Sequence, residues 1–197
     1  PSDVDALDGI GAEHGIPVIY DAAHAFGVKC HCGSVLNHGE LSVLSFHATK
    51  VFNTFEGGAI VSQTAEIKDH IDKLKNFGHD GETQVLETGI NGKVSEINAA
   101  FGLLQLQYVD AAISRRSEID ALYRAGLANV DGVTCLPGSG EASSNYSYFP
   151  VLIGPRYPIS RDELYDRMKQ AGVHPRRYFY PLLPEFPMYR DVPSADL

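Results

Sequence analysis

The chain has 197 residues, with 25 acidic and 16 basic side chains, and its net charge of -9 gives a sequence pI of about 5.3. An acidic field repels polyanions, so nucleic acid is excluded as a partner. A bilayer span needs roughly 20 consecutive apolar residues, and neither such a run nor a signal peptide is found. We therefore expect no membrane association and a cytoplasmic location.

The first hundred residues alternate between helical and strand patterns. Apolar residues at helical spacing predict a helix over 3–14, followed by a short apolar strand at 16–20. Two further strands are predicted at 41–46 and 58–62, and a helix at 65–75. This alternation is typical of an α/β fold.

The remaining residues begin with a loop and end in a smaller unit. Residues 77–93 are rich in glycine and lack periodicity, which predicts a loop. A helix is predicted from 94 to 106, continuing to about 127. Strands at 133–135 and 146–153, a helix from 160 to 172 and an extended piece at 177–180 then indicate an α+β unit.

Two side chains at predicted strand ends point to a specific chemistry. Asp21 follows the first strand and Lys50 follows the second. Ligands of open α/β sheets bind at the edge formed by the carboxyl ends of the strands, where both residues are expected. A partly buried lysine amine can form a Schiff base. A lysine for that bond and an aspartate for the pyridinium nitrogen are what pyridoxal phosphate needs. The pair therefore predicts a pyridoxal phosphate site.

The three cysteines predict reduced thiols rather than a disulfide. Cys30 and Cys32 are too close for an unstrained bridge, and Cys135 is distant in sequence. His24, Cys30, His31 and Cys32 offer zinc-type ligands, but neighbouring side chains of an extended segment point to opposite faces and no second pair completes a tetrahedron. We therefore predict no metal site.

Four ordered motifs carry a family resemblance. They are DAAHAFG (21–27), LSFHATKVFNTFEGGAIV (44–61), GINGKVSEINAAFGLLQL (89–106) and RRYFYPL (176–182). Together they resemble the DegT-type sugar-nucleotide aminotransferases, which are fold-type I pyridoxal phosphate enzymes. The resemblance covers nearly all of the chain and is greatest to members that make dTDP-4-amino-4,6-dideoxyglucose.

The resemblance implies the second half of an aspartate aminotransferase-like large domain with a mostly parallel sheet, followed by a small α+β C-terminal domain. Residues 1–105 would be the partial large domain, and residues 106–197 the interdomain helix and small domain. Family members are about twice as long, so the N-terminal half is expected to be missing. The family also implies a homodimer with shared active sites.

Site roles follow from the motifs residue by residue. Lys50 resembles the Schiff-base lysine that moves a proton between cofactor and substrate, and Asp21 the pyridinium partner. His24 would lie near the phenolic oxygen of the cofactor, and Ser45 would contact its phosphate. Asn91 would cross to the cofactor phosphate of a partner subunit, although Asn91-Gly92 also suits a simple type I′ turn.

The substrate side of the site is expected at RRYFYPL. Guanidinium groups bind diphosphate oxygens well, so the expected substrate contacts are Arg176, Arg177, Tyr178 and Tyr180. A solvated surface turn is the alternative. Many family members carry histidine where this chain has Leu183, which leaves sugar recognition open.

The resemblance implies transfer of an amino group from an amino acid, expected to be L-glutamate, to a nucleotide-linked keto sugar such as dTDP-4-keto-6-deoxyglucose. Three alternatives stay open at this point, and one is a generic amino-acid aminotransferase, a type that binds the substrate carboxylate with an arginine in a different C-terminal context. Relatives that dehydrate their sugar substrate carry histidine in place of the lysine, so Lys50 argues against that reaction. A non-catalytic protein of the same fold is the third alternative.

Overall fold

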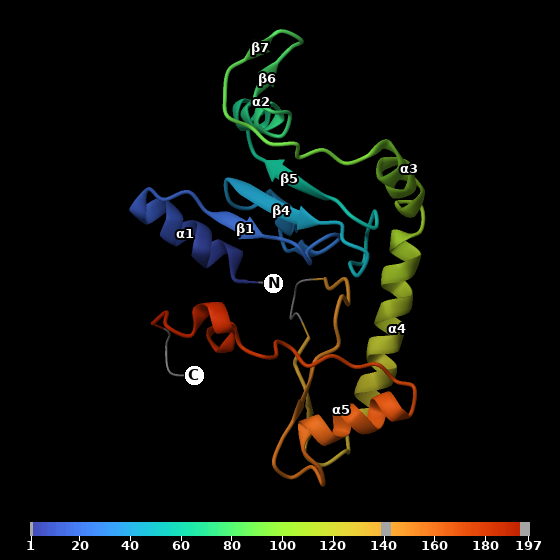
Figure 1. The fold of residues 1–197 in the computed structure, drawn as a ribbon. Helices are drawn as coiled ribbons and strands as arrows, with labels where there is room; N and C mark the ends of the chain where they lie inside the picture. Colours follow the sequence, from blue (N-terminus) through green and yellow to red (C-terminus); the bar gives the residue numbers. More distant parts are fainter. Residues whose placement is uncertain (1, 139–142, 194–197) are drawn as a thin grey trace. The chain divides into compact units, whose positions relative to one another are not determined.

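The computed structural model describes residues 2–138 and 143–193, and the chain forms two compact units (Figure 1). Unit 1 comprises Pro1–Ala128 and Cys135–Pro150, and unit 2 comprises Asn129–Thr134 and Val151–Leu197. The division into residues 1–105 and 106–197 stays a prediction, because a helix that joins two domains can be counted with either.

Unit 1 is built around a three-stranded mixed sheet of order β1-β4-β5. Strand β1 (Ile19–Asp21) pairs in parallel with β4 (Leu41–Ser45), and β4 pairs antiparallel with β5 (Gly58–Ser62). Helix α1 (Val4–His14) lies beside β1, where the Tyr20 hydroxyl donates to Asp8 Oδ1 at 2.9 Å. The predicted α/β class is confirmed, and Asp21 is the last residue of β1 itself.

Short elements fill the connections of unit 1. Between β1 and β4 lie an antiparallel hairpin of two-residue strands, β2 (Lys29–Cys30) and β3 (Gly33–Ser34), and the 3-10 helix η1 (Val35–Asn37). Helix α2 (Ala65–Leu74) follows β5. The predicted loop at 77–93 holds a second hairpin, β6 (His79–Asp80) with β7 (Gln84–Val85).

The predicted long helix is two helices with a break between them, α3 (Glu96–Gln105) and α4 (Val109–Leu127). Helix α3 begins where the Ser95 hydroxyl accepts from the Asn98 backbone N–H. Such an N-cap satisfies a donor that the first turn of a helix would otherwise leave unpaired.

Three phenylalanines pack beneath the strand ends of unit 1. The Phe26 and Phe52 rings stack with centroids 4.4 Å apart, and Phe46 meets Phe52 edge-on at 4.9 Å. Aromatic pairs of this geometry add to the stabilisation from buried area. The cluster therefore joins the segment after β1 to the segment after β4.

Unit 2 contains the two-stranded sheet of β8 (Val133–Cys135) and β9 (Val151–Ile153), helix α5 (Arg161–Gln170) and two 3-10 helices, η2 (Leu183–Glu185) and η3 (Pro187–Tyr189). The strand predicted at 146–153 is confined to β9, because Tyr146 adopts a positive φ of 51° that interrupts extended backbone. The predicted extended piece at 177–180 is not a strand, and Tyr178 and Phe179 form a turn there.

None of the helices in the described part of the chain has the length and hydrophobicity needed to cross a lipid bilayer.

Candidate active site

Lys50 lies in the turn that follows β4, and its amine contacts a histidine from the segment after β1. Its Nζ is 2.9 Å from His24 Nε2, and its backbone N–H donates to the His47 carbonyl at 2.9 Å. The Lys50 side chain is half-buried. Motifs that are 26 residues apart in sequence thus meet at one edge of the sheet.

Asp21 affects His24 through its negative charge. Partial burial, and then the positive charge of Lys50, hold the pKa of His24 below its usual value of 6.5, while the charge of Asp21 opposes them. Of the two predicted residues, Lys50 contacts His24 directly, and Asp21 acts on it through its charge.

The tautomer of His24 follows from these contacts. A neutral imidazole that accepts from the Lys50 ammonium at Nε2 carries its proton on Nδ1. His24 Nδ1 is 3.4 Å from Ser147 Oγ, which can accept that proton in a hydrogen bond. Neutral His24 is therefore held between Lys50 and Ser147.

Ser45 ends β4 beside the same turn. Its hydroxyl accepts from the His47 backbone N–H at 3.3 Å, and the side chain is half-buried. Gly58, opposite Ser45 on β5, has no room for a side chain, since a Cβ there would lie 2.6 Å from the Leu44 carbonyl oxygen. Close pairing of β4 and β5 thus requires glycine at position 58.

Asn145 is a positioning residue that the sequence analysis missed. Its side chain is 4% exposed, and Nδ2 donates to the carbonyls of His24 at 2.7 Å and Phe26 at 2.9 Å. Its Oδ1 accepts from the Ser147 backbone N–H at 3.2 Å. Asn145 therefore fixes the backbone on both sides of the His24–Ser147 contact.

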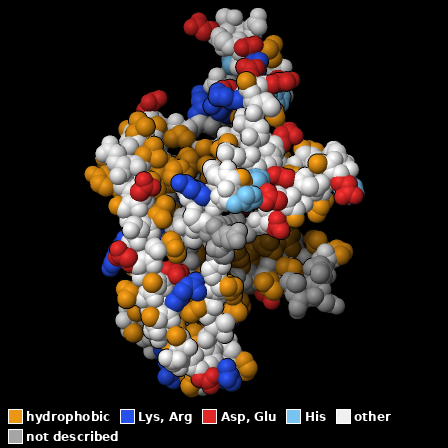
Figure 2. Space-filling model, turned by 180° about the vertical axis from the view of Figure 1, so that it is seen from behind, with side chains coloured by type: hydrophobic (Ala, Val, Ile, Leu, Met, Phe, Trp, Pro, Cys, Tyr) orange, Lys and Arg blue, Asp and Glu red, His pale blue; other side chains and the backbone are white. Residues whose placement is uncertain are grey.

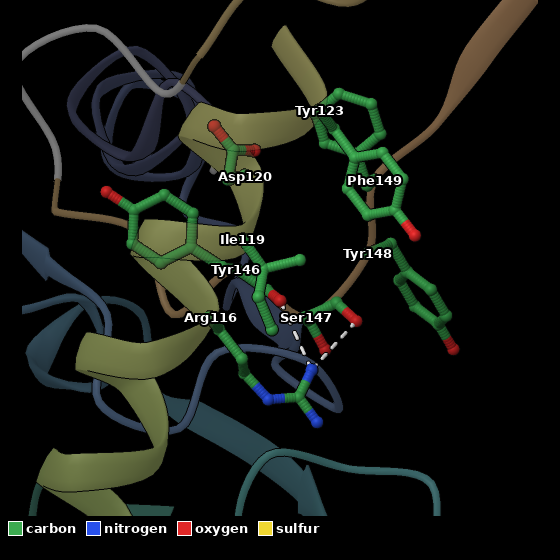
Figure 3. Close-up of a pocket in the computed structure, with 8 residues that line it drawn as sticks. All are labelled: Arg116, Ile119, Asp120, Tyr123, Tyr146, Ser147, Tyr148 and Phe149. Atoms are coloured by element: carbon green, nitrogen blue, oxygen red, sulfur yellow. Dashed lines mark hydrogen bonds between the residues drawn. The ribbon is translucent and has the colours of Figure 1, made fainter. Parts of the chain in front are cut away.

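A cavity of about 360 Å³ lies within unit 1 (Figure 3). Its walls are formed by one face of α4 and by an aromatic segment: Arg116, Ile119, Asp120, Tyr123, Tyr146, Ser147, Tyr148 and Phe149. Tyr148 also packs on His24, with ring centroids 4.9 Å apart. Ser147 and Tyr148, which line the cavity, are thus the residues that connect it to His24.

Asn91 does not form the type I′ turn that Asn91-Gly92 suggested. That turn needs positive φ at both residues, and neither of them is among the described residues with positive φ. Asn91 instead forms an isolated antiparallel bridge with Asn76, and the Gly92 N–H donates to the Lys75 carbonyl at 2.8 Å. The bridge ties the start of this segment to the end of α2.

The two arginines of RRYFYPL, in unit 2, differ in their surroundings. The Arg177 guanidinium is 3.3 Å from Asp162 Oδ1 and lies over the rings of Tyr165 and Tyr180 at 4.6 and 4.5 Å. Arg176 is exposed, and no ion pair is found for it in the described ranges. Arg177 is thus held within its own unit, whereas Arg176 is accessible to a ligand.

Tyr178 and Tyr180 are also exposed in unit 2. Tyr180 packs against the Arg161 guanidinium at 5.0 Å, and the Tyr178 ring meets Phe179 edge-on at 4.8 Å. Leu183 begins η2 and is 66% exposed. Tyr180 thus packs between the guanidinium groups of Arg161 and Arg177, and part of its ring stays exposed.

Residues 1–196 match the DegT/DnrJ/EryC1/StrS aminotransferase family, and the chain belongs to this family. It is 52% identical, over 98% of its length, to dTDP-4-amino-4,6-dideoxy-D-glucose transaminase of Shigella dysenteriae, and 47% identical, over its full length, to the Escherichia coli protein of the same name. It spans 52% and 53% of these curated relatives, about half their length.

Two solved structures share the fold over the whole chain. DesI, determined in the presence of its TDP-sugar product, matches with a TM-score of 0.90 and 37% identity, over 50% of its own chain. DesV of S. venezuelae, in complex with a ketimine intermediate, matches with a TM-score of 0.89 and 25% identity, over 52% of its chain. The expected half of an aminotransferase fold is thereby confirmed.

Proposed function

We propose that the protein is a pyridoxal phosphate-dependent aminotransferase that moves an amino group from an amino acid, L-glutamate in our expectation, to a nucleotide-linked keto sugar. We further propose dTDP-4-keto-6-deoxyglucose as the sugar substrate. Relatives at 52% and 47% identity, both named dTDP-4-amino-4,6-dideoxy-D-glucose transaminase, support this choice. The single observation that carries the proposal is the contact of Lys50 with His24 beside Asp21.

The residues at this sheet edge suit pyridoxal phosphate in their donor chemistry. Lys50 supplies an amine for the aldehyde carbon, Asp21 a carboxylate for the ring nitrogen, and Ser45 a hydroxyl for the phosphate. When bound, the cofactor supplies an electron-accepting ring that stabilises negative charge on the substrate carbon. Asp21 would maintain the proton on that ring nitrogen.

Lys50 would handle protons at the reacting carbon, and His24, expected near the phenolic oxygen of the cofactor, would orient the Lys50 amine. Lys50 Nζ is the group that moves a proton to and from substrate, and general acid–base catalysis of this kind contributes roughly 100- to 10,000-fold. The hydrogen bond to His24 Nε2 orients the amine. Because the pKa of His24 is lowered, the ring stays neutral near pH 7 and accepts this hydrogen bond.

We propose that Arg176, Arg177, Tyr178 and Tyr180 contact the nucleotide sugar. Arg176 would bind the diphosphate directly, since its guanidinium is exposed. Arg177 would contact the nucleotide sugar from a fixed orientation, since its guanidinium is held by Asp162 and by the rings of Tyr165 and Tyr180. Leu183 would leave the sugar without the polar contact that many relatives supply.

We propose a homodimer in which Asn91 reaches the cofactor phosphate of the partner subunit. In Figure 2, hydrophobic side chains gather over α3 and the start of α4, directly after the Asn91 segment in sequence. Ile97 and Leu103 there are 81% and 69% exposed. Exposed apolar surface of this kind favours an interaction site, and the second copy is the partner we propose. We place the reaction in the cytoplasm, where three free thiols remain reduced.

The test uses full-length protein with pyridoxal phosphate, L-glutamate and dTDP-4-keto-6-deoxyglucose, and the product is identified by mass. We expect the 4-amino sugar from wild type, a loss of about 100- to 10,000-fold in Lys50→Ala, and normal activity in Lys68→Ala. Lys68 is the matched control because it is exposed on α2 and paired with Asp72. Normal amination by Lys50→Ala would refute the proposal.

A further inference from the structure

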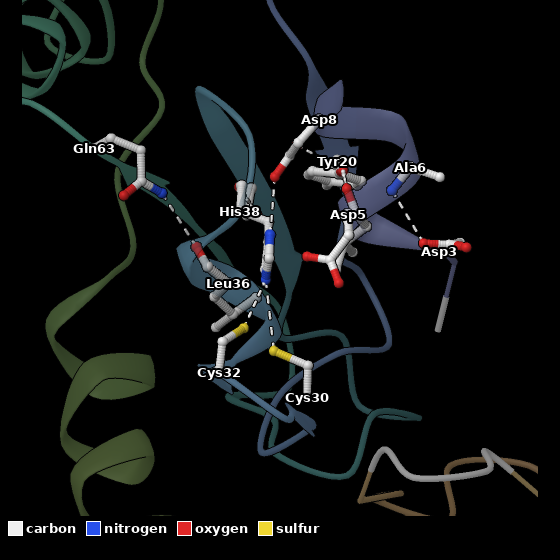
Figure 4. A network of polar contacts seen from close by, with 12 residues as sticks. Asp3, Asp5, Ala6, Asp8, Tyr20, Cys30, Cys32, Leu36, His38 and Gln63 are labelled. Carbon is white, nitrogen blue, oxygen red and sulfur yellow. Dashed lines mark hydrogen bonds and ion pairs between the residues drawn. The ribbon is translucent and has the colours of Figure 1, made fainter. Parts of the chain in front are cut away.

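Two cysteines and a histidine outside the candidate active site meet in unit 1 (Figure 4). His38 Nε2 lies 3.1 Å from Cys32 Sγ and 3.5 Å from Cys30 Sγ. All three ligand atoms lie within 4.8 Å of one another. The histidine is one that the sequence analysis did not consider, while His24 contacts Lys50 and His31 faces Asp5 at 3.8 Å.

The hairpin between β2 and β3 places the two sulfurs on one side. Cys30 pairs with Gly33 across the hairpin, and Cys32 lies in the turn between them. Gly33 has a φ of 119°, which favours glycine. The turn brings both sulfurs to the same nitrogen, since Cys30 Sγ and Cys32 Sγ each lie within 3.5 Å of His38 Nε2.

A carboxylate fixes the orientation of His38. Asp8, on α1, lies with Oδ2 2.9 Å from His38 Nδ1, and its Oδ1 accepts from the Tyr20 hydroxyl at 2.9 Å. The Tyr20 hydroxyl is also 3.2 Å from the Val4 carbonyl. With its proton on Nδ1 toward Asp8, the imidazole presents the lone pair of Nε2 to the two sulfurs. A carboxylate behind the ligating histidine is the usual arrangement at zinc sites.

We propose that Cys30, Cys32 and His38 bind Zn²⁺ through Sγ, Sγ and Nε2, with Asp8 as the residue that positions the histidine. Zinc bonds of about 2.3 Å to sulfur and about 2.0–2.1 Å to nitrogen at a tetrahedral angle place these atoms about 3.5 Å apart. The observed separations of 3.1 and 3.5 Å are already close to that spacing. Thiolate and imidazole together favour zinc over harder cations.

The site is independent of amino transfer and serves the fold. Cys32 is exposed, so solvent can supply the fourth ligand. Bound zinc would join the hairpin to α1 through His38 and Asp8, and it would stabilise the connection between β1 and β4 that carries DAAHAFG. Because the unfolded chain does not hold these ligands together, zinc binding would add to folding stability.

The test measures metal binding by full-length protein that has been stripped with a chelator and kept reduced with a phosphine. Co²⁺ serves as the spectroscopic probe, because tetrahedral thiolate complexes of cobalt absorb in the visible. We expect one Co²⁺ per chain with thiolate absorption, its displacement by one equivalent of Zn²⁺, and a rise in the thermal midpoint with Zn²⁺. Absence of the thiolate band, or of the rise, in wild type would overturn the proposal.

The Zn²⁺ affinity of single variants distinguishes the proposed ligands from nearby residues that do not bind the metal. Cys32→Ser should lower Zn²⁺ affinity by more than about 100-fold, and Asp8→Asn by about 10- to 100-fold, as expected for an outer partner. Cys135→Ser and His31→Gln are matched controls that should leave affinity unchanged. Unchanged Zn²⁺ affinity in a Cys30→Ser/Cys32→Ser double variant would also overturn the proposal. Circular dichroism of each metal-free variant verifies that it is folded.

Discussion

Asn145→Ala tests how the candidate active site is held together. The buried Asn145 amide makes three hydrogen bonds, to the His24 and Phe26 carbonyls and from the Ser147 N–H. Each such bond contributes about 0.5–1.5 kcal/mol net, and the substitution leaves its partners unsatisfied in a buried place. We therefore expect the free energy of unfolding to fall by about 2–4 kcal/mol.

The assay is urea unfolding followed by circular dichroism, with the change taken from the transition midpoint at constant slope. Asn37→Ala is the matched control, since Asn37 is exposed at the end of η1. Its effect should stay within about 0.5 kcal/mol. A loss in Asn145→Ala no larger than that of the control would refute the role assigned to Asn145.

Three further predictions concern packing, protonation and unit 2. Gly102→Val should lower the free energy of unfolding by about 1–3 kcal/mol in the same urea assay, because a Cβ at Gly102 would lie 2.8 Å from the buried Thr54 methyl. Gly126→Ala, in open space on α4, should raise it by about 0.5–1 kcal/mol. Equal effects of the two substitutions would contradict this prediction. His24 should titrate by NMR with a pKa below 6.5, and this pKa should fall further in Asp21→Asn, because the charge of Asp21 opposes the lowering. Since the unfolded state binds a proton on His24 more readily than the folded state, the free energy of unfolding should decline as the pH falls from 6.5 toward the lowered pKa of folded His24. A His24 pKa above 6.5 would count against this prediction. Arg177→Ala should lower the thermal midpoint by about 2–4 °C without substrate, through loss of its aromatic and carboxylate contacts; an unchanged midpoint would show that these contacts add nothing.

The elements that the sequence predicted well are those with sharp local signals. Residues 58–62 and 133–135 are strands with the predicted bounds, because glycine or turn residues flank a short apolar run. The helix from Arg161 was expected because Ser160 is a good N-cap, and its hydroxyl accepts from the Glu163 N–H. Local chemistry decides these boundaries.

The features that the sequence did not predict depend on distant partners. Asn145 lies 121 residues from His24 in sequence, so no periodicity marks it as a buried amide. The Cys30–Cys32 hairpin has strands of two residues, too short for an alternation pattern, and His38 joins it only after η1. Tertiary contacts place Asn145 and the cluster of Cys30, Cys32 and His38, and no local sequence pattern predicts such contacts.

The role proposed for Lys50 is tested by mapping the lysine that holds the cofactor. Full-length protein loaded with pyridoxal phosphate is reduced with borohydride, digested and analysed by mass spectrometry, so that a covalently held cofactor is fixed to its lysine. We expect a pyridoxyl group on Lys50, and its loss together with cofactor absorbance in Lys50→Ala. A label on any other lysine of wild type, with Lys50 unmodified, would contradict it.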